Sequence, residues 1–137
     1  MSKILVVDGQ GGGVGRQLIS AIKATMPNAQ ITAVGTNSIA TQAMLKAGAD
    51  EAATGENALI VACRRAKYIL GPIGIVIADS LMGEISPKMA AAVGQSEAMR
   101  ILVPSNRCGS YIVGLQEQNI ALLVEKAVQA LKESTAY

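Results

Sequence analysis

Residues 4–16 read ILVVDGQGGGVGR, and this stretch decides the fold. Four aliphatic residues are followed by a glycine-rich turn, and an amphipathic segment begins directly after the turn. A strand, a glycine turn and a helix in that order present free backbone N–H groups at the positive end of the helix, where a phosphate binds well. The spacing Gly9-x-x-x-Gly13-x-Gly15 is one variant of the dinucleotide-binding turn. The commoner G-x-G-x-x-G pattern does not fit, because position 14 is Val. We therefore expect a nucleotide-binding α/β protein.

Length and composition indicate one domain with an aliphatic core. The chain has 137 residues, half of them hydrophobic, with no Phe or Trp and three Tyr. A chain of this length forms one compact domain, which we expect to span residues 1–137. A core of Ile, Leu, Val, Ala and Met is typical of buried parallel strands. So high an aliphatic fraction also predicts apolar surface buried between subunits, and hence a homo-oligomer.

Charge, cysteine spacing and hydropathy indicate which partners and which location to expect. The formal net charge is +2, with cations and anions interspersed, so we expect no nucleic-acid partner. The densest basic cluster, Arg64-Arg65-Ala66-Lys67, is interpreted as a helix C-terminus. Cys63 and Cys108 form no C-x-x-C motif, and without a signal peptide a cytoplasmic location is expected. The apolar run 69–78 is too short to cross a bilayer and is broken by Gly and Pro, so no membrane partner is expected.

The apolar periodicity predicts alternating strands and helices. Expected strands cover residues 4–7, 31–34, 49–53, 68–70 and 100–103. Expected helices cover 14–26, 38–47, a segment starting at 54 or 55 and carrying the basic cluster, 86–94 and 118–132. Alternation of this kind predicts a single Rossmann-like three-layer sandwich with a mostly parallel sheet and helices on both faces.

Two further segments are less regular. Residues 73–81 form an apolar run that fits a buried strand or a buried helix, and we favour a helix because Pro72 suits a first helical turn and Gly83 suits a stop. Residues 111–115 are expected to form a strand. With residues 100–103 and a turn at 107–110, this strand would make a hairpin at one edge of the sheet.

The residues of the first turn are the main candidates for ligand binding. Asp8 is expected to organise the turn by hydrogen bonds, Gly9 to allow the sharp exit from the strand, and Gly15 to allow tight helix–strand packing. The segment Gln10-Gly11-Gly12-Gly13-Val14 would let the backbone approach a phosphate. A glycine-rich turn without a ligand is the alternative. Five glycines in seven residues are costly for a mere connection, which favours a ligand.

The end of the second strand bears on which nucleotide binds. NAD-binding proteins often place an acidic residue there to hold the ribose hydroxyls, but this chain has Gly35-Thr36-Asn37-Ser38. Small hydroxyl and amide groups at a helix N-terminus would accept a 2′-phosphate. This favours a ligand other than NAD, which would be NADP, a mononucleotide or another phosphorylated metabolite. Plain helix capping by these residues is the alternative.

Three more turns are expected at the same edge of the sheet, because each follows a strand parallel to the first. Ligands in such folds bind outside the carboxyl ends of the strands, so these turns are the expected walls of the pocket. Arg107 is their one cation and would hold a phosphate or carboxylate, unless it is merely a solvated turn residue. The three turns are Thr54-Gly55-Glu56-Asn57, Gly71-Pro72-Ile73-Gly74 and Pro104-Ser105-Asn106-Arg107.

Catalytic groups are scarce, and no catalytic residue is assigned. The chain has no His, which removes the usual general base and most zinc sites, and we expect no metal. The turn looks like that of short-chain dehydrogenases, but the Tyr-x-x-x-Lys pair of that family is missing. No Gly-Lys-Ser/Thr pattern is present, so a P-loop is excluded. The carboxylates nearest the expected site are Asp8, Glu56, Asp79 and Glu84.

A set of short motifs carries a resemblance to a known family. The motifs are residues 8–15, 35–37, 53–57, 71–74, 83–89 and 106–108, which together cover nearly the whole chain. They resemble a family of small bacterial proteins of unknown function, found chiefly in anaerobic Gram-positive organisms. The resemblance implies that these turns are shared within the family, and it implies no activity.

Three hypotheses about function follow. The first is a cytoplasmic sensor or binding module for a nucleotide, with NAD or NADP as the first candidate. The second is a small enzyme for a phosphorylated or nucleotide substrate, using Glu56, Asn57, Arg107 and Asp8 or Glu84. The third is an oligomeric assembly or scaffold protein whose nucleotide site has degenerated. It predicts large apolar interfaces and a first turn blocked by side chains or by a neighbouring subunit.

Overall fold

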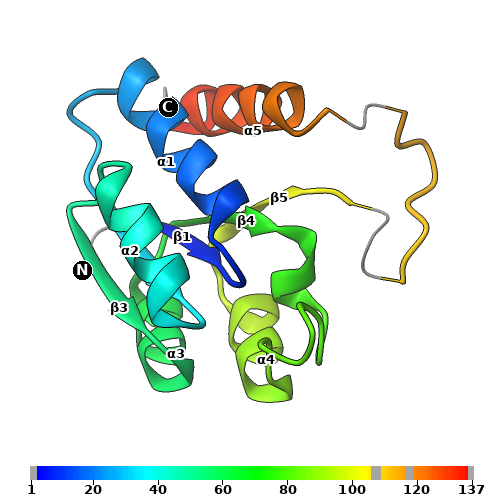
Figure 1. The fold of residues 1–137 in the computed structure, drawn as a ribbon. Coiled ribbons are helices and arrows are strands. Elements are labelled where there is room, and N and C mark those ends of the chain that lie inside the picture. The colour runs from blue at the N-terminus through cyan, green and yellow to red at the C-terminus, as the bar shows by residue number, and fades with distance from the viewer. Residues whose placement is uncertain (1–2, 106–108, 117–118, 136–137) are drawn as a thin grey trace.

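The computed structural model describes residues 3–105, 109–116 and 119–135. Within these residues the chain forms a five-stranded, wholly parallel sheet in the order β3-β2-β1-β4-β5 (Figure 1). The strands are β1 (Ile4–Asp8), β2 (Ile31–Gly35), β3 (Glu51–Thr54), β4 (Tyr68–Pro72) and β5 (Met99–Val103). The helices are α1 (Gly13–Thr25), α2 (Ser38–Lys46), α3 (Glu56–Arg65), the short 3₁₀ helix η1 (Ile73–Val76), α4 (Pro87–Gln95) and α5 (Ile120–Thr135). The strand order reverses between β1 and β4, which is the usual ligand-binding point of such sheets.

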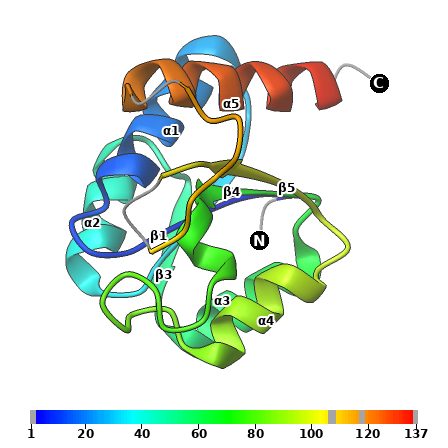
Figure 2. The ribbon, with the colours of Figure 1, turned by 90° about the vertical axis from the view of Figure 1, so that its right-hand side faces the viewer.

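Helices cover both faces of the sheet, as predicted (Figures 1 and 2). Successive residues of a strand point to opposite faces of the sheet, and in β1 they pack into two different hydrophobic cores. Val6 packs with the apolar residues of α1 and α5, whereas Val7 packs with those of α3 and α4. Both cores are almost wholly aliphatic, in agreement with the composition. The sheet and its two helical layers thus form a three-layer α/β sandwich.

Side chains cap the N-termini of α2 and α4. The Asn37 side chain caps α2 by accepting a hydrogen bond from Ala40 N at 2.9 Å. Ser86 caps α4, accepting from Met89 N at 3.2 Å, and Pro87 occupies the first helical position. Such caps satisfy backbone N–H groups that a helix leaves without partners. These two helices therefore begin within a residue of where the sequence predicts them.

The prediction for residues 73–81 is only partly right. A helix does begin after Pro72, but it is the single 3₁₀ turn η1, and residues 77–84 form successive turns. Asp79, Leu81 and Met82 have positive φ angles of 66°, 54° and 57°, which an α-helix does not admit. Ile75 is fully buried, so the chain enters the core there and must turn back sharply to reach α4.

The expected edge hairpin is wrong. The described residues 109–116 contain no strand and form a turn in which Leu115 N donates to Ile112 O at 3.2 Å. The apolar residues Tyr111 and Val113 are 82% and 89% exposed, so their alternation buries no face against β5. A period-2 pattern specifies a strand only where one face is covered. The 107–110 turn of this prediction lies partly outside the described residues.

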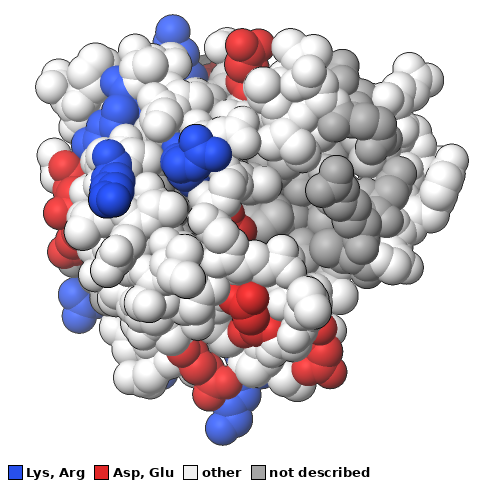
Figure 3. Space-filling model, in the orientation of Figure 1, with Lys and Arg blue, Asp and Glu red and all other residues white. Residues whose placement is uncertain are grey.

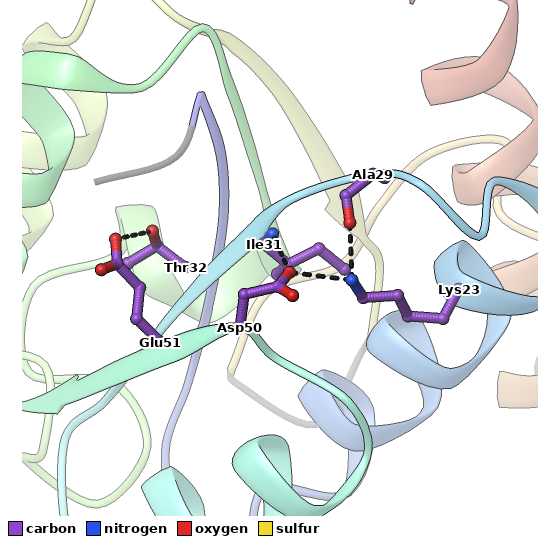
Figure 4. Close-up of polar contacts among 6 residues, drawn as sticks. All are labelled: Lys23, Ala29, Ile31, Thr32, Asp50 and Glu51. Carbon is purple, nitrogen blue, oxygen red and sulfur yellow. Dashed lines mark hydrogen bonds and ion pairs between the residues drawn. The ribbon is translucent and has the colours of Figure 1, made fainter.

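Polar contacts at the amino edge of the sheet tie β2, β3 and α1 together (Figure 4). Lys23 donates to Ala29 O at 2.6 Å and to Asp50 Oδ2 at 2.8 Å, and the same oxygen accepts from Ile31 N at 2.8 Å. Thr32 donates to Glu51 across the β2–β3 pair at 2.8 Å. These contacts hold the start of the edge strand β3 in register, at the end of the sheet opposite the glycine-rich turn.

Charged side chains of both signs lie on the surface (Figure 3), and Cys63 is buried. Positive and negative side chains are both scattered over the face shown in Figure 3, without a continuous patch of either sign. Arg64 and Arg65 lie in the last turn of α3, as interpreted. Burial raises the pKa of the Cys63 thiol to about 11, so it is inert at neutral pH. Among the helices of the described residues, none is long and apolar enough to cross a membrane.

Candidate functional site

The glycine-rich turn leaves β1 in a left-handed conformation and enters α1 without a break. Gln10 and Gly12 have φ angles of 49° and 74°. Gly12 N donates to Gly9 O at 2.9 Å, and Arg16 N donates to Gly12 O at 2.8 Å as α1 begins. A residue with positive φ at the helix N-cap favours glycine, since other side chains are strained there. The turn therefore points the first amides of α1 toward the carboxyl edge of the sheet.

Asp8 organises this turn, as predicted. Its side chain is 5% exposed, with Oδ1 accepting from Gly9 N at 2.8 Å and Oδ2 accepting from Gly15 N at 2.7 Å. Burial raises the pKa of Asp8, hydrogen bonds from the Gly15, Gly9 and Val14 N–H groups oppose that rise, and the nearby charge of Glu84 adds to it. With both oxygens held by backbone donors, Asp8 is a structural clamp on the turn.

The glycines of the turn serve two different purposes. At Gly9, Gly12 and Gly15 a Cβ atom would lie within about 3 Å of neighbouring atoms, so these positions are required by close packing. At Gly11 and Gly13 a Cβ would meet nothing within 4 Å. No described residue accepts a hydrogen bond from the N–H groups of Gly11 and Gly13. These two amides lie at the start of a helix, where the dipole favours an anion.

A cavity of about 400 Å³ adjoins the turn at the carboxyl ends of β1, β4 and β5. One side is the glycine-rich backbone, and the opposite side is largely apolar. Its lining residues are Asp8, Gly9, Gln10, Gly11, Gly12, Gly13, Val14, Pro72, Leu81, Val103, Pro104, Ser105 and Ile120. A volume in this range, with an apolar wall and a few polar groups, is typical of small-molecule sites.

A larger hollow of about 610 Å³ lies between α3 and α4. It is lined by helix side chains such as Ile60 and Lys88 and includes none of the strand ends. Because ligands of open α/β sheets bind at the carboxyl ends of the strands, the smaller cavity is the candidate site.

Glu84 reaches the end of β2, beside the glycine-rich turn, from the segment between η1 and α4. Its Oε1 atom accepts three hydrogen bonds, from Gln10 N at 2.9 Å, from Thr36 Oγ1 at 2.6 Å and from Asn37 Nδ2 at 2.7 Å. Burial alone would raise the pKa of Glu84, but the three hydrogen bonds together hold it below its ordinary value of 4.5. A carboxylate therefore stands at the end of β2 after all, supplied by a distant part of the chain.

The lowered pKa of Glu84 predicts a pH-dependent contribution to stability. The ionised carboxylate stabilises the folded chain fully above its ordinary pKa of 4.5, and this contribution is lost as the pH falls through the lowered folded value. We expect Glu84→Gln to be less stable than wild type by about 1 kcal/mol at pH 7, since charged hydrogen bonds become neutral ones. Urea unfolding should show this difference shrinking toward pH 3. A difference that grows on acidification would contradict the assignment.

The structure brings together only part of the predicted site. Residues 8–14 and Pro72 line the cavity. Gly15, Gly35 and Gly71 are buried packing positions, and Ile73 begins η1 outside the lining. Thr36 and Asn37 are engaged with Glu84 rather than open to a ligand.

The turn after β3 contributes nothing to the cavity. Thr54 bonds Thr41 at 2.7 Å, Glu56 accepts from Ser86 at 2.5 Å, and Asn57 is exposed in the first turn of α3. The physical reason is distance across the sheet, since β3 is the edge strand beyond β2. The predictions for Asn106, Arg107 and Cys108 fall outside the described residues.

Sequence reasoning missed the apolar wall of the cavity. Leu81, Val103 and Ile120 line it, yet they come from a turn, a strand end and a helix start that are far apart in the chain. No local pattern marks such residues as neighbours. Glu84 was recognised as a nearby carboxylate, but its three donors could not be inferred.

Comparison with known proteins places the chain in a family. No curated protein matches it. Among solved structures it is similar to a dodecameric FMN-dependent UbiX-like decarboxylase from Escherichia coli O157:H7, with 21% sequence identity and a TM-score of 0.48. That match covers 94% of this chain and 76% of that chain, and it carries no argument about ligand or activity. The resemblance to a family of unknown function is confirmed, because the family model matches residues 3–136. The chain belongs to the family described as a domain of unknown function (DUF3842).

Proposed function

We propose that this protein binds a nucleotide, with a phosphate group against the N–H groups of Gly11 and Gly13. The observation that carries the proposal is a cavity whose lining combines glycine-rich backbone with apolar side chains. The free amides of Gly11 and Gly13 belong to this lining, and so do side chains such as Leu81 and Val103. Amides at a helix N-terminus suit a phosphate, and an apolar wall suits a flat ring.

A binding or sensing role agrees better with the site than catalysis does. The enzyme hypothesis uses Glu56 with Asp8 or Glu84, but Asp8 is the one carboxylate among the described lining residues and both of its oxygens hold the turn. Glu56, the expected catalytic carboxylate, is bonded to Ser86 away from the cavity. We propose a cytoplasmic location for this binding module.

NAD and NADP remain the first dinucleotides to test. The proposal that Thr36 and Asn37 accept a 2′-phosphate is weakened, because both side chains donate to Glu84 and a phosphate there would face a carboxylate. A ribose with free hydroxyls, or a nucleotide that does not reach the end of β2, suits this arrangement better.

One observation favours the scaffold hypothesis as a second candidate. It predicts a first turn blocked by side chains, and Glu84 does occupy the N–H of Gln10. Exposed Tyr111 and Val113 supply apolar surface for a homo-oligomer. Light scattering with and without nucleotide separates the two candidates. An oligomer whose size is indifferent to nucleotides, in a protein that binds none of them, would favour the scaffold.

Thermal unfolding tests the proposed function directly. A nucleotide present at about a hundred times its dissociation constant adds about 2.7 kcal/mol of stability, which is a shift of several degrees for a domain of this size. The panel is NAD, NADH, NADP, NADPH, ATP, ADP, GTP, AMP, FMN and coenzyme A. We expect a shift with at least one nucleotide.

Two matched valine variants locate the binding site. Gly13→Val fills the open space beside the free amides and should abolish the shift. Gly94→Val makes the same change in α4, at a glycine with equally open surroundings outside the cavity, and should keep it. Absence of a shift with every nucleotide in the wild-type protein would overturn the proposal.

A further inference from the structure

We propose that Glu84 and the segment carrying it close the β2 side of the glycine-rich turn, so that the site selects a mononucleotide over a dinucleotide. This inference rests on the proposed function and names its ligand class. It makes Glu84 a specificity-determining residue. Its carboxylate occupies space, and engages hydrogen-bond donors, that the second nucleotide of a dinucleotide would need.

The closure is built from side chains packed directly over Gly9. A Cβ atom at Gly9 would lie 2.6 Å from Thr36 Oγ1, 3.0 Å from Leu81 Cδ1 and 3.1 Å from Glu84 Oε1. This face of Gly9 is therefore covered by groups from the residue after β2 and from the 79–85 segment. A chain of atoms that crossed this face toward the β2 side would meet Thr36, Leu81 and Glu84.

The hydrogen-bond donors at the end of β2 are already satisfied. A dinucleotide spreads across the strand-order reversal and places one ribose at the end of the second strand. Here the donors at that place are Gln10 N, Thr36 Oγ1 and Asn37 Nδ2, and all three bond Glu84 Oε1. A second nucleotide half would have to displace this carboxylate and break three hydrogen bonds together.

The 79–85 segment is held in place by its own contacts. Asp79 N donates to Ile85 O at 2.7 Å, Gly83 N donates to Asp79 O at 3.1 Å, and the Ser80 hydroxyl donates to Gly74 O. Ile85 is fully buried and anchors the segment in the core. The wall is thus part of the folded domain, and Glu84 is presented to the turn from a fixed base.

On the β4 side of the turn, the described residues leave a cavity. The cavity of about 400 Å³ has the free amides of Gly11 and Gly13 at one end and Val103, Pro104 and Ile120 along its wall. Glu84 does not line it. One phosphate and one ring attached through a ribose match this cavity. The closed β2 side excludes the second nucleotide of a dinucleotide.

Titration calorimetry with two matched ligand pairs tests the inference. The pairs are FMN with FAD, and nicotinamide mononucleotide with NAD, so that each dinucleotide contains its mononucleotide. We expect wild-type protein to bind a mononucleotide at least tenfold more tightly than its dinucleotide. Glu84→Ala removes the acceptor of all three hydrogen bonds, and dinucleotide binding should tighten until this ratio falls below threefold.

Glu84→Gln is the matched control. Its amide oxygen can accept the same three hydrogen bonds, so the ratio should stay near the wild-type value if the wall excludes by occupying space. Thr36→Val, which removes one of the three donors, should lower the ratio by less than Glu84→Ala does. Thr36→Val also tests the inference if the Glu84→Ala protein does not fold.

Each outcome has a distinct meaning. Equal or tighter binding of dinucleotides by the wild-type protein overturns the inference and leaves the proposed function standing. A tenfold preference that Glu84→Ala and Thr36→Val both leave unchanged overturns the role of Glu84. Failure of both classes to bind the wild-type protein overturns the proposed function itself.

Discussion

Replacing Gly71 by alanine is expected to destabilise the domain by more than about 3 kcal/mol, or to prevent folding. Gly71 lies in β4, and a Cβ there would stand 2.3 Å from Val7 O in the neighbouring strand β1 and 3.0 Å from Ile75 Cδ1. A backbone carbonyl in the central ladder cannot yield without loss of the β1–β4 pairing. Thermal unfolding should show a melting temperature lower by more than about 10 °C.

Gly94→Ala is the control for this prediction. Gly94 lies in α4 with open space around its missing Cβ, and alanine favours a helix over glycine by about 1 kcal/mol. We expect this variant to be as stable as wild type or slightly more so. A Gly71→Ala protein with an unchanged melting temperature would show that β4 approaches β1 less closely than described. The predicted result would mean that strand packing requires glycine at position 71. Gly71 would then no longer be a candidate for ligand binding.

Asp8→Ala is expected to cost about 2–4 kcal/mol of stability and to abolish the nucleotide-induced thermal shift. The variant leaves the buried N–H groups of Gly9 and Gly15 without acceptors. Each such group carries a desolvation penalty of about 1–3 kcal/mol, partly offset because a buried carboxylate is also removed. Without the clamp, the amides of Gly11 and Gly13 lose the fixed orientation that a phosphate requires. Urea unfolding and the nucleotide panel measure the two effects.

Asp8→Asn separates the clamp from the charge. Asparagine restores one acceptor and offers a donor where the second acceptor stood, so it should lose stability, but less than alanine does. An Asp8→Ala protein that keeps both its stability and its nucleotide-induced shift would contradict the role of Asp8 as clamp. Full stability in Asp8→Asn would instead mean that one oxygen suffices to hold the turn.

Much of the fold and the centre of the candidate site could be predicted from the sequence. The first strand, the turn and α1 follow from residues 4–16, because β-propensity, glycine conformation and helical periodicity all act over a few residues. The caps Asn37 and Ser86 are equally local. Parallel alternation of strands and helices then placed the glycine-rich turn at the carboxyl edge of the sheet. Even the clamp by Asp8 spans only seven residues.

Tertiary structure alone decided which distant groups meet at that edge. Glu84 bonds Gln10 across a separation of 74 residues, and its loop has left-handed turns that no helical or strand periodicity announces. The strand expected at residues 111–115 failed for the same reason, since alternation becomes a strand only where a neighbour buries one face. The sequence by itself determined the three-layer sandwich and the free amides of the turn, because short-range conformation and periodicity determine these. The closure of the β2 side depends on packing between segments far apart in the chain, and the structure alone shows it.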